Sequence, residues 1–140
     1  MSLSLDEREE FLAQPHIGAL SVVERADRAP LTVPIWYAYA PGGELWIRTP
    51  PGSRKARAIA ATGRFSLMVQ RVAPTVRYVS VEGPVTATLP DSDARARELA
   101  QRYLPADKVD GYLEFERTQL PEHAVISMRP EHWLSADLGG

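Results

Sequence analysis

The segment Pro50-Pro51-Gly52-Ser53-Arg54-Lys55-Ala56 contains the residues with the clearest potential for chemistry. Two prolines and a glycine end a strand-like stretch, and Ser53 can then cap a helix. Free N–H groups at a helix N-terminus, together with the helix dipole, favour an anion there. Arg54 can bind phosphate with two parallel hydrogen bonds, and Lys55 adds a compact charge. The spacing predicts a phosphate-monoester site, although an ordinary capped helix with solvated basic residues has the same pattern.

The charge distribution supports an anion site in the same part of the chain. No acidic residue lies between Glu44 and Glu82. The 37 residues 45–81 contain seven basic residues: Arg48, Arg54, Lys55, Arg57, Arg64, Arg71 and Arg77. The rest of the chain has 9 basic and 18 acidic residues, so the positive charge is local. Such a distribution favours a small phosphorylated ligand over nucleic acid, which usually needs positive charge across the whole domain. We expect two or three of the seven basic residues to pair with surface acids instead.

Aromatic residues are concentrated in a second segment, residues 34–39. In a strand, Ile35, Tyr37 and Tyr39 share one face, and Trp36 and Ala38 share the other. One face can pack in the core while the other provides a platform for a planar ring. The alternative is that these aromatic residues serve only the core and a dimer contact.

The sequence lacks the residues and motifs that several other kinds of site require. The chain has no cysteine, which excludes disulfides, thiol nucleophiles, thiolate zinc sites and iron–sulfur clusters. The glycine patterns of P-loops, Rossmann folds and serine-hydrolase nucleophile elbows are absent. The histidines His16, His123 and His132 have no other His, Asp or Glu at i+2, i+3 or i+4, although a glutamate directly precedes His123 and His132. We therefore expect no metal site and identify no catalytic dyad.

Mostly short strands must position these residues. The length of 140 residues, with 44% hydrophobic residues and a net charge of −2, fits a single domain over 1–140. Helices are predicted from a capping box at Ser4–Glu7 to before Pro15, and over residues 54–62, 91–103 and 107–117. Strands are predicted over residues 17–23, 31–40, 45–49, 65–70, 76–88 and 124–128, with a bend at Gly83-Pro84. Hairpins without helical crossovers indicate a mainly β, antiparallel barrel or sandwich.

The N-terminus is acidic and lacks an apolar signal region, and no apolar run approaches the ~20 residues of a membrane span. We therefore expect a cytoplasmic protein that does not enter a membrane.

Three segments, in this order, resemble the pyridoxamine 5′-phosphate oxidase-like superfamily of flavin-binding split β-barrels. They are Thr32-Val-Pro-Ile-Trp-Tyr37, Leu45-Trp-Ile-Arg-Thr49 with Gly52-Ser-Arg-Lys-Ala56, and Tyr78-Val-Ser-Val-Glu-Gly-Pro-Val85. The N-terminal helix and the tail Arg129-Pro-Glu-His-Trp-Leu134 also fit, so the resemblance covers most of the chain. It implies an antiparallel, six-stranded, Greek-key-like split barrel.

The resemblance also implies a cofactor and its site. It identifies the chain as an FMN-binding oxidoreductase that transfers hydride between the flavin and a small organic substrate. By this resemblance, the cofactor would lie between the subunits of a homodimer. Its phosphate would be held by Ser53, Arg54 and Lys55. The ring would be lined by the backbone at Val33, Pro34, Ile35 and Trp36. Arg48 and Thr49 contact the ring or the ribityl chain, and Tyr78 stands where true oxidases have a ring-contacting glutamine.

Departures from the family pattern narrow the function. Val33 replaces the arginine that opens the ring-binding strand of true oxidases, and Ala38 replaces a lysine that binds pyridoxal phosphate. The C-terminal extension with its arginine–histidine substrate motif has no counterpart before Gly140, so pyridoxine phosphate oxidation is not implied. Short members of the family bind FMN or the deazaflavin coenzyme F-420. A non-catalytic carrier of flavin, haem or deazaflavin is a second hypothesis, and a barrel that binds single-stranded nucleic acid is a third, disfavoured by the overall acidity.

Overall fold

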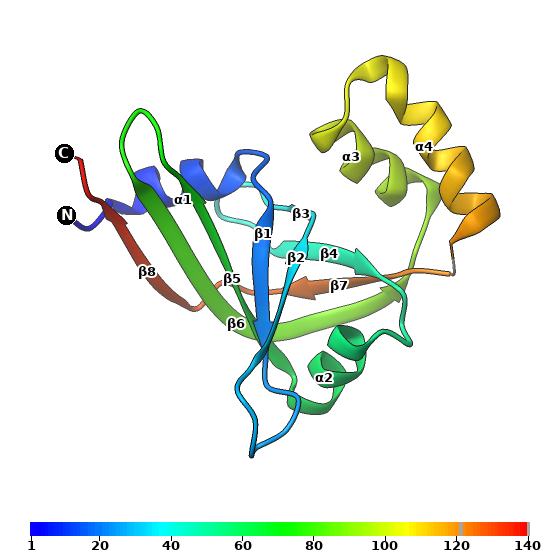
Figure 1. The fold of residues 1–140 in the computed structure, drawn as a ribbon, viewed down its shortest axis with the longest axis horizontal. Helices are drawn as coiled ribbons and strands as arrows, with labels where there is room; N and C mark the ends of the chain where they lie inside the picture. Colours follow the sequence, from blue (N-terminus) through cyan, green and yellow to red (C-terminus); the bar gives the residue numbers. More distant parts are fainter. Residues whose placement is uncertain (121, 140) are drawn as a thin grey trace.

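A computed structural model describes residues 1–120 and 122–139, in which helices surround a strongly curved antiparallel sheet (Figure 1). In chain order the elements are α1 (Leu5–Ala13), β1 (Gly18–Val22), β2 (Leu31–Ile35), β3 (Tyr37–Ala38), β4 (Leu45–Thr49), α2 (Arg54–Thr62), β5 (Arg64–Arg71), β6 (Arg77–Pro90), α3 (Asp93–Tyr103), α4 (Ala106–Gln119), β7 (Ala124–Met128) and β8 (His132–Asp137). The predicted mainly β, antiparallel fold is confirmed, and the predicted helices and strands lie within a few residues of the observed ones.

The long strand β6 joins the two halves of the barrel. The sheet order is β2-β1-β5-β6-β7-β4-β3, and β8 also pairs with β6. The first part of β6 pairs with β5 and β8, and its last part pairs with β7 after a register shift between Val85 and Ala87. A Cβ at Gly83 would lie 1.8 Å from the carbonyl oxygen of Arg129, so only glycine permits this close approach. The predicted bend at Gly83-Pro84 therefore lies just before the observed irregularity.

The aromatic segment changes partner strands in its middle. β2 pairs with β1, whereas β3 pairs with β4, so the chain crosses from one half of the barrel to the other at Trp36. The predicted single strand over residues 31–40 is therefore two strands. The predicted alternation of faces is confirmed, because Tyr37 and Tyr39 lie in the main core while Trp36 and Ala38 pack toward α3.

The C-terminal tail is the second difference from the predicted strand set. Residues 132–137, expected to follow the last strand as a tail, form β8 along residues 77–82 of β6. Six strands were therefore too few, since the split at Trp36 and the pairing of the tail each add one. The tail becomes a strand because it pairs with a free edge of β6. A local sequence pattern does not show where such an edge will lie.

The α3–α4 hairpin stands beside the barrel (Figure 1). Leu99 of α3 and Tyr112 and Glu116 of α4 line the cavity described below. Leu99 of α3 packs with Ala38, Trp46 and Val125 of the barrel. Ala96, Ala100, Val109 and Leu113 hold the two helices together. Within residues 1–120 and 122–139, no helix is both long enough and apolar enough to cross a bilayer.

Candidate functional site

The turn from β4 into α2 forms as the sequence predicts. The Ser53 hydroxyl accepts a hydrogen bond from the Ala56 N–H at 3.3 Å, and Ser53 and Thr49 hydroxyls lie 3.1 Å apart. The helix ends at Gly63, whose φ of 74° is the left-handed conformation that favours glycine. Because Ser53 satisfies Ala56, the N–H groups of Arg54 and Lys55 remain without an acceptor inside the helix. These two donors point out of the N-terminus of α2, where the helix dipole attracts an anion.

Lys55 is a half-buried cation at this helix start. None of the carboxylates in the described part of the chain forms an ion pair with it, and burial lowers the pKa of its ammonium group. A partly desolvated cation without an anion is destabilised, and a bound anion relieves that cost. Lys55 is thus the residue of this turn that most favours an anionic ligand.

Arg54 differs from Lys55 because it already holds a carboxylate. Its Nε and Nη2 donate to the two oxygens of Glu24 at 2.9 and 2.6 Å. Glu24 follows β1 in sequence, 30 residues before Arg54, and was not among the predicted site residues. The pair is largely solvent-exposed on the arginine side.

Four of the predicted ring-contacting residues line one cavity. Pro34, Ile35, Trp36 and Arg48 border a space of about 280 Å³, together with Ile17, Leu99, Tyr112, Glu116 and His123. Arg48 of β4 borders this cavity, and the next residue of the strand, Thr49, contacts Ser53 at the helix start. The backbone at Val33 belongs to the same strand, while the Val33 side chain packs against the main core.

Trp36 has aromatic neighbours within the chain. Its ring stacks on Tyr103 with centroids 4.8 Å apart, and Tyr112 lies 5.5 Å away at a tilt of 32°. The Tyr112 hydroxyl donates to Glu116 at 3.0 Å, and burial raises the pKa of Tyr112 to about 12, helped by the charge of Glu116. Trp36 and Tyr112 therefore form an aromatic wall of the cavity, next to the buried Glu116 carboxylate.

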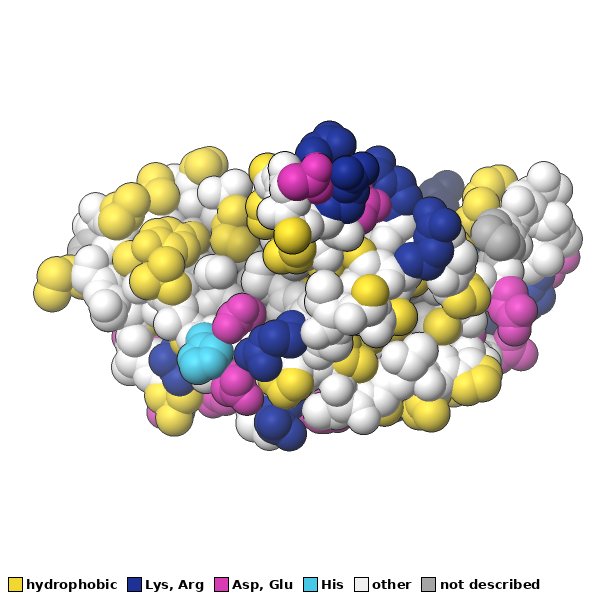
Figure 2. Space-filling view, turned by 90° about the horizontal axis from the view of Figure 1, so that it is seen from below, with side chains coloured by type: hydrophobic (Ala, Val, Ile, Leu, Met, Phe, Trp, Pro, Cys, Tyr) yellow, Lys and Arg dark blue, Asp and Glu magenta, His cyan; other side chains and the backbone are white. Residues whose placement is uncertain are grey.

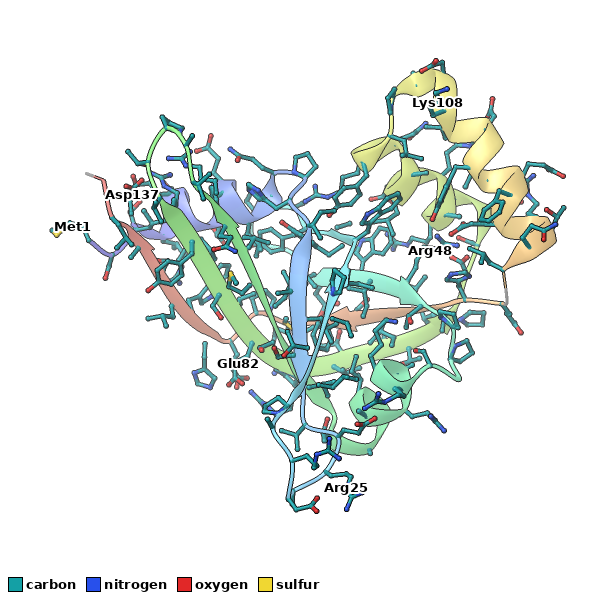
Figure 3. All side chains as sticks on the ribbon, viewed as in Figure 1. Met1, Arg25, Arg48, Glu82, Lys108 and Asp137 are labelled. Atoms are coloured by element: carbon teal, nitrogen blue, oxygen red, sulfur yellow. The ribbon has the colours of Figure 1, made fainter. Side chains whose placement is uncertain are left out.

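Arg48 is buried and engaged by two carboxylates beneath the α3–α4 hairpin (Figure 3). It donates to Asp91 from Nε and Nη2 at 3.0 and 2.7 Å. It also donates to Glu116 from Nη2 and Nη1 at 3.1 and 3.3 Å. Burial alone would lower the pKa of Arg48, but the hydrogen bonds to Asp91 and Glu116 hold it above its usual value. A contact between Arg48 and a cofactor stays a prediction, and the observed role of its guanidinium is to tie β4 to the hairpin.

Tyr78 lies apart from the other predicted site residues. It pairs with Gln70 of β5 and Ala136 of β8 near the start of β6. The Val85 N–H, farther along β6, donates to the Gly63 carbonyl at the end of α2. Tyr78 and Val85 are seven positions apart, which is about 23 Å along an extended strand. Within one chain, Tyr78 therefore lies far from the end of α2 that contacts β6.

The expectation that two or three basic residues of the segment pair with acids was too low. Five of the seven form ion pairs, namely Arg48, Arg54, Arg64, Arg71 and Arg77. Because residues 45–81 contain no acid, every partner comes from another part of the chain. Among the residues that the structure describes, Lys55 and Arg57 are the two without an ion pair.

Glu116 is the site residue that the sequence could have revealed. Val109, Leu113 and Glu116 form the buried stripe of α4, so a carboxylate stands at an apolar position of a helical repeat. A charge there signals a buried partner. Glu24 carries no comparable signal, because its partner Arg54 is distant in sequence. The described residues contain no cluster of three or more His, Asp or Glu side chains that could hold a metal ion.

Comparison with known proteins fits this arrangement. Residues 4–136 match the protein family described as pyridoxamine 5′-phosphate oxidase. The chain belongs to the pyridoxamine 5′-phosphate oxidase family. Members of this family bind flavins or the deazaflavin F-420, and its characterised members are largely oxidoreductases. No curated protein matches the chain significantly.

Solved structures show the same split barrel. An F-420 reductase is 28% identical, with a TM-score of 0.70 over 90% of this chain and 94% of its own. A conserved hypothetical protein from Mycobacterium tuberculosis is 20% identical, with a TM-score of 0.70 over 96% and 85% of the two chains. An FAD-binding protein from Mesorhizobium loti is 19% identical, with a TM-score of 0.67 over 99% and 98%. The last two show the fold alone.

The residues at the start of α2 fit a phosphate-bearing cofactor. The set of donors contains only groups that favour an anion: two outward N–H groups, the Lys55 ammonium and the Arg54 guanidinium. Arg54 holds an internal anion, the Glu24 carboxylate, which shows that this position accommodates negative charge.

Proposed function

We propose that this chain is an oxidoreductase that binds FMN, with the phosphate of the cofactor at the N-terminus of α2. The observation that carries the proposal is Lys55, a half-buried cation without a carboxylate partner among the described residues, beside outward-facing N–H groups. Membership of a family that binds flavins or F-420 supports it. The alternative of single-stranded nucleic-acid binding gains no support from this family.

Each residue of the site has a distinct task in this proposal. Ser53 caps α2 and keeps its first N–H groups open to the phosphate. Arg54 and Lys55 neutralise the phosphate charge, and the backbone of residues 33–36 lines the ring in the cavity next to Arg48. The bound cofactor supplies hydride transfer to or from a small organic substrate. The hairpin residues Tyr112 and Glu116 close the cavity on one side and limit access of water.

We propose that the site is completed in a homodimer, at the interface between two copies. Tyr78 is half-exposed and far from α2 of its own chain, which supports the proposal that a second copy supplies this residue to the site. Mixing two variants that should each weaken FMN binding tests this arrangement. Tyr78→Ala and Arg54→Ala/Lys55→Ala each damage both sites of a homodimer, whereas their heterodimer contains one intact site. After subunit exchange of an equal mixture, about a quarter of all sites should bind FMN with wild-type affinity. No recovery despite verified exchange would contradict a shared site.

The deazaflavin F-420 is the second candidate cofactor. It is favoured by the F-420 reductase, which is 28% identical and matches 90% of this chain. Its phosphate and tricyclic ring would need the same anchor and cavity, so the geometry does not separate it from FMN. A non-catalytic carrier would bind either cofactor and show no oxidation of the reduced cofactor with any acceptor.

Equilibrium titration of FMN and F-420, followed by absorbance and fluorescence, tests the proposal. Arg54→Ala/Lys55→Ala should weaken the affinity for the phosphate-bearing cofactor about a hundredfold, because two charge-assisted interactions are lost. Arg129→Ala/Lys108→Ala is the matched control, since it removes the same charge from exposed positions elsewhere. The proposal fails if neither cofactor binds, or if the double variant at α2 binds as tightly as the control.

A further inference from the structure

We infer that Glu24 is an internal competitor for the cofactor phosphate, because its carboxylate occupies the guanidinium fork of Arg54. This inference rests on the proposed phosphate site at α2. It adds Glu24 as a residue that lowers the affinity of this site for phosphate. The carboxylate acts as a resident anion, and the phosphate must either displace it or bind beside it.

The geometry of the Glu24–Arg54 pair matches the contact that a phosphate would make. Both carboxylate oxygens accept hydrogen bonds, one from Nε and one from Nη2 of Arg54, at 2.9 and 2.6 Å. Arginine binds phosphate through the same planar, two-pronged arrangement. While Glu24 is in place, this edge of Arg54 is closed to a second anion.

The surroundings of Glu24 are positively charged. The β1–β2 loop and α2 lie at the bottom of the molecule in Figure 1. In the view from below, basic side chains gather there around a few acidic ones (Figure 2). The hydrogen bond and charge of Arg54, with the charges of Arg28 and Arg57, lower the pKa of Glu24. The carboxylate therefore remains ionised at neutral pH, so it occupies Arg54 under the conditions in which a cofactor binds.

The pair is weak enough to be displaced. The Arg54 side chain is 62% exposed and that of Glu24 is 30% exposed, so water screens the attraction between them. A phosphate monoester carries between one and a half and two negative charges at neutral pH and competes well for the same fork. If the phosphate binds without displacing Glu24, repulsion between the two anions lowers its affinity instead. Removal of the Glu24 charge strengthens phosphate binding in both cases.

Titration of FMN and riboflavin into Glu24→Gln tests this inference, with quenching of flavin fluorescence as the readout. We expect about two- to fivefold tighter binding of FMN than in the wild type and no change for riboflavin, which has no phosphate. Asp27→Asn is the matched control, because it removes the same charge from the same loop but frees Arg25 instead of Arg54. We expect the control to change neither affinity by as much.

The outcomes separate the inference from the proposed function. If the wild type prefers FMN to riboflavin and Glu24→Gln leaves that preference unchanged, Glu24 does not compete with the phosphate. If Glu24→Gln lowers the preference, Glu24 positions Arg54 instead, and either result overturns the inference. If the wild type shows no preference for FMN, the phosphate site itself is wrong and the inference falls with it. In an Arg54→Ala background the gain from Glu24→Gln should be reduced, since the contested guanidinium is gone. Circular dichroism and the unfolding midpoint check that each variant is folded, as expected for exposed positions.

Discussion

Arg48 and Arg54 lie six residues apart, and both are held by carboxylates in a fork, but their surroundings differ. The side chain of Arg48 is 6% exposed and bound by Asp91 and Glu116, whereas that of Arg54 is 62% exposed and bound by Glu24 alone. A buried guanidinium must keep its partners, while an exposed one can exchange a carboxylate for another anion at little cost. Because Arg48 is buried, its ion pairs hold β4 to the α3–α4 hairpin, whereas the exposed Arg54 is accessible to a ligand.

The largest expected effect of this difference concerns stability. Arg48→Met should lower the free energy of unfolding by about 3–5 kcal/mol, because it leaves Asp91 and Glu116 without their buried cation. Arg54→Met should leave the unfolding midpoint nearly unchanged, because its partner is exposed to water. Urea unfolding followed by fluorescence measures both. Equal losses of unfolding free energy in the two variants would show that burial does not distinguish Arg48 from Arg54.

The carboxylate partners should repeat the pattern with a smaller effect. Glu116→Gln keeps the shape of the side chain but weakens its bonds to Arg48 and Tyr112, and should cost about 1.5–3 kcal/mol of stability. Glu24→Gln should leave stability almost unchanged and act on ligand affinity instead. Urea unfolding measures the stability of both variants. A Glu116→Gln protein as stable as the wild type would show that Arg48 does not need the Glu116 charge in addition to that of Asp91.

The third prediction concerns Asp137, whose contribution to stability should be seen as a pH dependence. It accepts hydrogen bonds from the Gly139 N–H, Thr75 and Arg77, which lower its pKa to about 2. Because the folded-state pKa is below the usual value, its contribution to stability is complete above pH 4 and is lost as the pH falls toward 2.

Asp137→Asn should remove this contribution. The stability difference between wild type and variant should therefore be constant near neutral pH and shrink between pH 4 and pH 2, as measured by thermal unfolding. A difference that does not change with pH in this range would contradict the assigned role of the ionised carboxylate.

Sequence reasoning succeeded where interactions are local. The capping box of α1, the Ser53 cap and the Gly63 end of α2 all depend on residues within a few positions, and all are observed. It failed where the deciding partner is distant. The carboxylates that bind Arg48 lie 43 and 68 residues away, and β8 pairs with residues of β6 that lie 50 to 60 positions earlier. The capped turn from β4 into α2 could thus be predicted, whereas the ion-pair partners of Arg48 and the pairing of Glu24 with Arg54 could not.

The most direct test of the account is the ratio of the dissociation constants for riboflavin and FMN in wild type and Arg54→Ala/Lys55→Ala. The two ligands differ only in the phosphate, so the ratio isolates the anchor at α2. We expect a ratio of about a hundred in the wild type and a ratio near one in the double variant, with the unfolding midpoint unchanged. A wild-type ratio that survives in the double variant would show that the phosphate is held elsewhere and would contradict the account.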